Sequence, residues 1–135
     1  MNRQRGMSSL ALVLLLLVLG SLMLQGLNQQ QRALSTRVAV ETRALREQAS
    51  VHSALQWGRM QHWQVNPSLQ CVQQPAQSWQ VCLRRLSDDS LLLIAASGSM
   101  TLWQSGEVSH GEVRFSPHGW SDFCPLMESA LCRIP

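Results

Sequence analysis

One apolar segment near the N-terminus constrains the fold of this chain more than any other feature. Residues 7–27 contain no charged side chain, and a short head carrying Arg3 and Arg5 precedes them. At about 1.5 Å per residue this segment would extend about 31 Å as a helix, close to the hydrocarbon thickness of a bilayer. Lipid offers the backbone no hydrogen-bond partner, so such a segment must be helical. We therefore expect residues 7–27 to span a membrane.

Three kinds of N-terminal segment could explain the basic head and the apolar run. A cleaved secretory signal needs a small-x-small site behind the apolar run, but the run continues here through Gly20-Ser-Leu-Met-Leu24. An uncleaved membrane anchor fits well. A prepilin-type leader also fits, because a basic six-residue head ends in Gly6 directly before the apolar residues. Glycine leaves room for a protease to approach the backbone. The head alone leaves the last two alternatives open.

The placement of arginines predicts the orientation of the chain. Arg3 and Arg5 precede the apolar run, and the next charged residue is Arg32. By the positive-inside rule the head stays in the cytoplasm and the remainder crosses. Removing Arg3 and Arg5 lowers the formal net charge from +3 to +1. Part of the basic character therefore reports topology, and we expect a single pass through the inner membrane with a periplasmic C-terminal domain.

The four cysteines all lie on the crossed side of the predicted span. An even number in a small domain indicates two disulfides in an oxidising compartment such as the periplasm. Four cysteines allow three pairings. We favour Cys71–Cys82 and Cys124–Cys132, because each pair closes a short loop across a predicted turn.

The residues after the span favour a continuation of the same helix. No proline interrupts residues 28–62, and Gln, Arg, Ala, Leu and Glu dominate. We expect one helix from about Ser8 to about Trp63, apolar on all sides in its first half and amphipathic in its second. Asn66-Pro67 should end it, because the residue before proline resists helical geometry. Apolar residues recur at three- and four-residue steps and their sums on two stripes: Leu27, Leu34, Val38, Leu45 and Ala49, then Val51, Ala54, Leu55 and Gly58 on a shifted stripe.

The remaining residues predict short strands separated by turns. Trp57, Trp63, Trp79 and Trp103 are expected to pack in the core. The fold class is therefore α+β, with a long N-terminal helix packed on a small antiparallel β-sheet that carries two disulfides. Strands are expected at 69–73, 79–86, 91–96, 100–104 and 112–115, with turns at 74–78, 87–89, 97–99, 105–106 and 110–111, a loop over 116–124 and helical turns over 125–131 that start at Pro125.

No group of residues in the sequence predicts catalysis or a cofactor. The histidines are His52, His62, His110 and His118, and the first two lie about 80° apart around the predicted helix. The cysteines lack C-x-x-C spacing, so we expect no metal site. Ser121-Asp122 follows His118, but there is no G-x-S-x-G elbow, so we expect no enzyme.

The basic residues outside the head do not predict nucleic-acid binding. Arg84, Arg85 and Arg114 are too few to form a basic stripe and are more typical of a solvated surface. We therefore do not expect a nucleic acid among the partners.

The chain resembles a known class of filament proteins. The Arg5-Gly6 junction, the apolar helix start, the amphipathic continuation and the small cysteine-bearing β-rich domain are similar to minor type IV pilins and type II secretion pseudopilins. The likeness is closer to the enterobacterial YgdB proteins, which are small and prepilin-like. It covers nearly the whole chain and is most specific in three runs: Met7-Ser-Ser-Leu-Ala-Leu-Val13, Ala54-Leu-Gln-Trp-Gly58 and Phe115-Ser-Pro-His-Gly-Trp-Ser-Asp-Phe-Cys-Pro-Leu126.

This resemblance implies a type IV pilin-like fold and a processing step. Prepilin peptidase would cleave between Gly6 and Met7, and Met7 would be N-methylated. The implied partners are this peptidase, the lipid of the inner membrane, and other minor pilins or pseudopilins that contact the N-terminal helix. The segments are then a cleaved leader at 1–6, a transmembrane half-helix at 7–27, an amphipathic half at 28–63 and a periplasmic β-rich domain at 64–135.

The sequence departs from the main pilin pattern at the fifth mature position. Most pilins carry a glutamate there, which meets the terminal amine of a neighbouring subunit, whereas this chain has Ala11. The K-type pseudopilin at the filament tip also lacks the glutamate, and a tip subunit has no neighbour above it to meet. The resemblance therefore favours a tip or assembly-priming subunit. The alternative is a single-span anchored periplasmic protein for binding or quality control that joins no filament.

Overall fold

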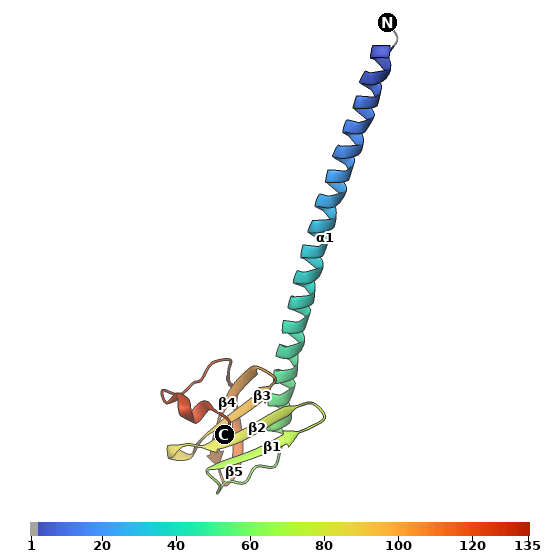
Figure 1. Cartoon of the computed structure of the whole chain (residues 1–135). Coiled ribbons are helices and arrows are strands. Elements are labelled where there is room, and N and C mark those ends of the chain that lie inside the picture. Colours follow the sequence, from blue (N-terminus) through green and yellow to red (C-terminus); the bar gives the residue numbers. More distant parts are fainter. Residues whose placement is uncertain (1–2) are drawn as a thin grey trace. The chain divides into compact units, whose positions relative to one another are not determined.

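The computed structural model describes residues 3–135, so Met1 and Asn2 of the predicted leader lie outside the described residues. The longest element is α1 (Arg3–Arg59), which is labelled in Figure 1. The chain divides into two compact units: a first unit that ends at Arg43, and a second unit from Ala44 to Pro135. The last turns of α1 therefore belong to the same unit as the sheet.

The helix differs from the sequence-based expectation at both ends. It includes Gly6 and Met7 without a break, because Arg and Gln in the head are good helix formers. It ends at Arg59, ahead of Asn66-Pro67. Two carbonyls in its last turn accept hydrogen bonds from side chains that follow the helix. Gln61 Nε2 donates to Trp57 O at 3.1 Å, and Trp63 Nε1 donates to Gly58 O at 2.8 Å. These side chains satisfy the end of the helix and turn the chain away.

The second unit contains a five-stranded antiparallel sheet in the order β1-β2-β3-β4-β5. Each strand pairs with its neighbour in the sequence (Figure 1). The predicted α+β class, with the helix packed on this sheet and two disulfides, is confirmed. The elements are β1 (Leu69–Gln74), β2 (Trp79–Arg85), η1 (Ser87–Asp89), β3 (Ser90–Ser97), β4 (Met100–Ser109), β5 (Glu112–Ser121) and η2 (Ser129–Cys132).

The last two strands are longer than expected because a bulge keeps them paired. Gly106 lies opposite Phe115, whereas Gln104 lies opposite Trp120, so the single residue Ser105 faces 116–119. The predicted turn at 105–106 and the predicted loop over 116–121 are therefore wrong. Pro117 lies inside the bulge, where no ladder hydrogen bond is required.

Side chains and a glycine hold this bulge together. The Gln104 side-chain amide donates to Ser116 O, and Ser105 Oγ donates to Gly119 O at 3.2 Å. A Cβ on Gly106 would lie 2.7 Å from Arg114 O, so only glycine fits there. The bulge thus depends on a buried amide that recovers the hydrogen bonds lost from the ladder.

The C-terminal segment contains one short 3₁₀ helix instead of turns that start at Pro125. The Cα atoms of Cys124 and Cys132 are 5.8 Å apart. A continuous α-helix across this interval would separate them by about 12 Å. The closed ring therefore excludes that helix, and only Ser129–Cys132 is helical.

The core lies where α1 packs on one face of the sheet. Val51, Ala54 and Leu55 of α1 are buried against β2, β3 and β4. Trp57, Trp63 and Trp79 pack around this cluster, as their predicted role requires. The buried sheet residues in the cluster are Val81, Leu83, Leu91, Leu93, Ala95 and Leu102.

The opposite face of the sheet carries a second, smaller cluster. Leu92 and Ile94 of β3 are buried there together with Cys132. Trp103 packs against them, in accord with its predicted packing role. Because β3 is covered on both faces, its residues 91–95 are all buried, and the strand reads as a continuous apolar run.

A polar contact fixes the helix against the first face. Ser50 Oγ on α1 lies 2.7 Å from Ser97 Oγ on β3, and Trp79 Nε1 donates to Ser50 Oγ at 3.0 Å. These groups are partly buried, so each hydrogen bond spares a polar atom the cost of burial without a partner.

We predict that Gly58→Ala destabilises the second unit. The added Cβ would lie 2.5 Å from Val81 Cγ1, and a β-branched side chain has little rotamer freedom to give way. Overpacking should cost about 1–3 kcal/mol, which exceeds the gain of up to about 1 kcal/mol in helix propensity. Denaturant unfolding of the full chain in detergent, followed by tryptophan fluorescence, measures the change.

Gly26→Ala is the matched control, because a Cβ at Gly26 meets nothing within 4 Å. The Gly58→Ala, Val81→Ala double variant should lose less stability than the two single losses added together. Additive losses in this cycle would show that the close contact at Gly58 is not the cause.

Candidate assembly surface

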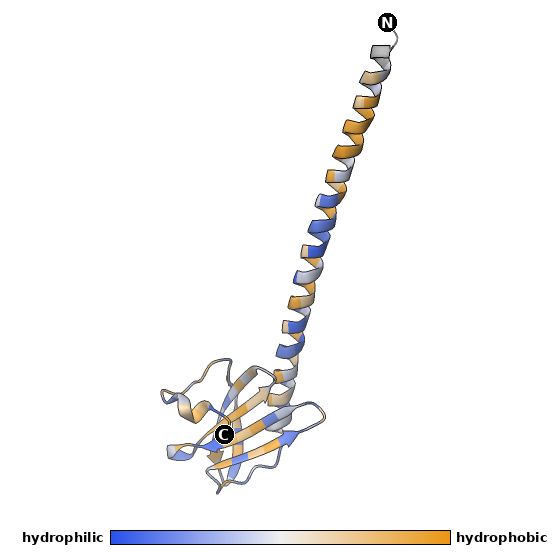
Figure 2. Cartoon of the chain, viewed as in Figure 1, coloured by the Kyte–Doolittle hydropathy of each residue, from blue (hydrophilic) through white to orange (hydrophobic). Residues whose placement is uncertain are grey.

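The first half of α1 presents apolar side chains that no other described residue of the first unit covers. Large apolar residues between Met7 and Leu27 are 51–75% exposed. Figure 2 shows them concentrated in the first half of α1, followed by mixed polar and apolar residues. This stretch is long and apolar enough to cross a membrane. The finding agrees with single-pass anchoring.

The predicted processing site lies inside the continuous helix. Ser9 Oγ donates to Gly6 O at 3.0 Å, and Met7 is 72% exposed. A Cβ on Gly6 would meet nothing within 4 Å, as is also true of Gly20 and Gly26. Glycine costs a helix about 1 kcal/mol relative to alanine. Packing among the described residues therefore does not require glycine at any of these three positions.

Ala11 lies one helical turn after Met7, on the same exposed segment of α1. Its methyl group adds no charge to this part of the helix. The surface from Met7 to Leu27 is therefore uniformly apolar, apart from the hydroxyls of Ser8, Ser9 and Ser21 and the Gln25 amide.

The second half of α1 carries exposed apolar residues among charged ones. Leu34, Val38 and Leu45 of the first predicted stripe are 59–67% exposed, whereas Val51 and Leu55 of the second stripe are buried in the core. The first stripe is therefore uncovered and the second is covered by the sheet. An uncovered apolar stripe on a helix is typical of a surface that packs on another helix.

Hydroxyl groups along this half of α1 are satisfied within the helix. Ser35 Oγ and Thr36 Oγ1 both donate to Arg32 O, at 3.0 and 2.9 Å. Thr42 Oγ1 donates to Val38 O at 2.7 Å. Such a helix can be covered by a partner without leaving these donors unpaired.

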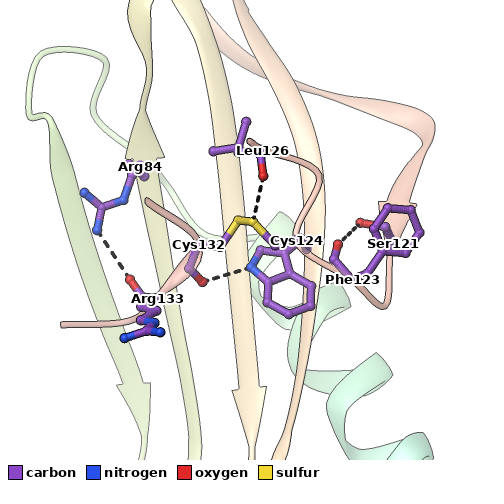
Figure 3. The surroundings of a disulfide bond; sticks show 8 residues. Arg84, Ser121, Phe123, Cys124, Leu126, Cys132 and Arg133 are labelled. Atoms are coloured by element: carbon purple, nitrogen blue, oxygen red, sulfur yellow. Dashed lines mark hydrogen bonds between the residues drawn. A yellow bond between two sulfur atoms is a disulfide. The ribbon is translucent and has the colours of Figure 1, made fainter. Parts of the chain in front are cut away.

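The C-terminal segment lies on the far face of the sheet from α1. Figure 3 shows the Cys124–Cys132 disulfide beside the strands, with Arg133 following it. Trp103 Nε1 donates to Cys132 O at 2.9 Å, and Arg84 Nη2 donates to Arg133 O at 3.3 Å. The Cys124 sulfur lies 3.4 Å from Leu126 O, a contact without a proton because the sulfur is bonded in the disulfide. The segment is thereby fixed at Cys132 and Arg133.

The other disulfide joins neighbouring strands. Cys71 and Cys82 face each other in the β1–β2 register, with their Cα atoms 4.1 Å apart. The two bonded pairs in the structure are the pairs that the sequence favours, and no cysteine is free among the described residues.

The remaining residues weighed as site candidates do not converge. His52 stacks edge-on against Trp120 with ring centroids 5.2 Å apart, and His110 Nδ1 lies 3.0 Å from Ser109 Oγ. His62 and His118 are exposed. Within residues 3–135 no three histidine, cysteine, aspartate or glutamate side chains gather where they could hold a metal ion.

The arginines outside the head have different surroundings. Arg85 Nη2 pairs with Asp89 Oδ1 at 2.7 Å, while Arg85 Nη1 donates to Val65 O at 3.3 Å. Arg84 contacts the C-terminal backbone, and Arg114 is exposed on β5. These three residues therefore do not form one basic surface.

Sequence reasoning missed the environment of Trp120. This residue is 51% exposed and contacts His52 of α1, so β5 reaches the helix side of the sheet. The missing signal was the bulge, which carries β5 through the Gly119-Trp120 run. The one local hint of the bulge in the sequence is Gln104, a polar residue at a position where the alternation of the strand predicts an apolar one. The structure shows that this glutamine is buried.

A family model described as "Protein of unknown function (DUF2509)" matches residues 15–132 of the chain. No curated protein and no solved structure matches the chain. The family match covers most of α1, all five strands and both disulfides.

We predict different outcomes from removing the two disulfides. Replacing Cys124 and Cys132 with serine should cost about 2.5 kcal/mol of unfolding free energy in the chain-entropy model, and should expose Trp103 to solvent quenchers. Replacing Cys71 and Cys82 should cost about as much but leave Trp103 protected. Denaturant unfolding and iodide quenching of the full chain test this. Equal quenching in both variants would show that the disulfide does not hold the C-terminal segment on Trp103.

Proposed function

Because the chain belongs to the DUF2509 family, whose function is unknown, we propose a function from its own residues: it is a minor-pilin-like structural subunit. We place it at the tip, or in the priming complex, of a type IV pilus or a type II secretion filament. The observation that carries this proposal is α1 itself. One helix joins an uncovered apolar segment, an uncovered stripe and a buried end that packs on a small disulfide-bonded sheet.

The length of α1 and its exposed apolar residues support a role in assembly over simple anchoring. A bilayer needs about 20 apolar residues, whereas the helix continues well beyond residue 27 before its core contacts begin at Val51. Between residue 27 and Val51 the side chains of Leu34, Val38 and Leu45 are exposed to solvent. Serine and threonine hydroxyls near these side chains donate to carbonyls of the helix itself. A helix packed against related helices uses both features.

The likeness to YgdB proteins and minor pilins supplies the finer parts of the proposal. Prepilin peptidase cleaves after Gly6, and Met7 is then N-methylated. The head faces the cytoplasm, and the disulfide-bonded domain faces the periplasm, where both disulfides are stable. The partners are other minor pilins or pseudopilins, reached through the N-terminal helix.

Ala11 supports a tip or priming position. A carboxylate in lipid is costly unless it is paired, and shaft subunits pair theirs with a neighbour's amine. A subunit with alanine there makes no such contact and needs no neighbour above it. The competing proposal is an anchored periplasmic binding or quality-control protein, which the same apolar segment also permits.

The first test is the mass of the mature N-terminus. We expect a chain that begins at N-methylated Met7 in cells with prepilin peptidase and at Met1 in cells without it. Gly6→Ala should slow cleavage several-fold, because a Cβ crowds the protease at the backbone. Gly20→Ala is the control, since it is the same change farther along the apolar helix. An intact N-terminus in both strains would support the anchored protein instead.

The second test addresses the tip position. In a tip subunit the carboxylate of Ala11→Glu has no amine to meet, and leaving it charged in lipid costs about 2.5–3.5 kcal/mol on insertion scales. Protonation would reduce this penalty. We therefore expect Ala11→Glu to be neutral or harmful to filament assembly, and deletion of the protein to lower filament number more than filament length. Immunogold labelling along whole shafts, or better incorporation of Ala11→Glu, would contradict the tip position.

A further inference from the structure

The two edges of the sheet differ in how they are protected from another strand. Because the strand order is β1-β2-β3-β4-β5, β1 and β5 are its edges. On β5, Glu112 and Arg114 place charges on the strand, and Pro117 lies in the bulge. Charges, proline and bulges are the usual means of blocking edge-to-edge pairing. β1 reads Leu-Gln-Cys-Val-Gln-Gln and has none of these features.

The pairing register identifies which backbone groups of β1 point outward. Arg85 N donates to Ser68 O at 2.9 Å, which makes 68 and 85 a hydrogen-bonded pair. Hydrogen-bonded and non-hydrogen-bonded pairs alternate along an antiparallel ladder. Leu69, Cys71 and Gln73 are therefore in the non-hydrogen-bonded pairs, consistent with the short Cα separation of Cys71 and Cys82. Their N–H and C=O groups face away from β2.

These outward groups have no partner within residues 3–135 among the hydrogen bonds found. The chain before β1 is held by a side chain instead, since Gln64 N donates to Gln70 Oε1 at 3.0 Å. The edge therefore offers three consecutive sets of backbone donors and acceptors to an incoming strand.

The side chains of β1 specify the chemistry of that strand. Val72 is half-buried and packs against the core on the helix side, whereas Cys71 and Gln73 are exposed on the other face. An apolar residue opposite Val72 would extend the core, and polar residues would suit the exposed face. No charge on β1 selects for a charged partner.

We propose that β1 is a docking edge, to which an extended, uncharged strand of a different subunit adds as the next strand of the sheet. This proposal rests on the proposed function, in which a scarce tip or priming subunit is surrounded by other subunits. A head-to-tail pairing of β1 with β5 of a second copy is disfavoured, because β5 carries the charges, the proline and the bulge. Backbone hydrogen bonds supply the affinity, and alternate side chains supply the specificity.

Photo-crosslinking of the full-length protein in its native cells tests the edge. The photoreactive residue p-benzoylphenylalanine replaces Gln73 on β1, His118 on β5, or Val38 on the exposed stripe of α1. We expect Gln73 to crosslink to an extended, uncharged segment of a different protein, at least tenfold more than His118 does. Absence of this adduct, equal adducts from His118, or an adduct between two copies of this chain would overturn the proposal.

Backbone variants then separate strand addition from side-chain contact. Gln73→Pro removes an outward N–H that the sheet does not use, whereas Gln73→Thr keeps it. The partner captured at Gln73 should co-purify at least tenfold less with Gln73→Pro and unchanged with Gln73→Thr. In the purified pair, amide exchange at Cys71 and Gln73 should slow. Undiminished co-purification with folded Gln73→Pro, or unchanged exchange, would overturn strand addition.

If Gln73→Pro lowers the unfolding midpoint, Gln73→Lys replaces it, with His118→Lys as the matched change on the protected edge. Only the β1 variant should release the partner, and equal release or no release would overturn the proposal.

Crosslinks from Val38 keep this result distinct from the proposed function. Adducts from Val38 to other prepilin-like subunits without adducts from Gln73 would refute the docking edge alone. Absence of both would refute filament membership as well.

Discussion

Gly58 lets the last turns of α1 approach β2 so closely that an added Cβ would lie 2.5 Å from Val81 Cγ1. This approach allows Val51, Ala54 and Leu55 to be buried on the sheet, and the Ser50–Ser97 contact fixes the helix there. Burial of such side chains contributes about 1.5–3 kcal/mol each for the larger ones. Without this packing the sheet would have no cover on its first face.

The second face depends on the C-terminal segment. β3 is too apolar to face water on either side, so a second layer is required over Leu92 and Ile94. Cys132 fills this place, and its carbonyl accepts the Trp103 indole N–H. The disulfide to Cys124 keeps the segment in reach, because a closed ring limits how far it can move from the sheet. The sheet therefore has one face covered by the segment that precedes it in the sequence and the other face covered by the segment that follows it.

These two covering segments use few residues, and other parts of the chain keep apolar side chains or backbone groups exposed. The helix before Val51 keeps its apolar residues exposed, with hydroxyls bonded to its own carbonyls. The sheet has one edge with charges, proline and a bulge, and one edge without them. Under the proposed function, the exposed half of α1 would meet lipid and related helices, the open strand edge would meet another subunit, and such binding would add to the stability of the folded state.

The long helix, the positions of β1, β2 and β3, and the favoured cysteine pairs could be read from local patterns. Periodicity, the basic head and short loops between cysteines act over a few residues, which is the range that a sequence displays directly. The sequence also determined that residues 7–27 form an apolar helix. Filament membership, processing at Gly6 and the tip position stay predictions that follow from resemblance.

Tertiary structure alone decided the rest. β5 continues through Pro117 because Gln104 on another strand satisfies the bulge. The apolar stripe that starts at Val51 is buried, whereas the stripe that contains Leu45 is exposed, because only the first of these two meets the sheet. In each case the deciding contact joins residues that local periodicity cannot relate, so it exists only once the sheet has formed.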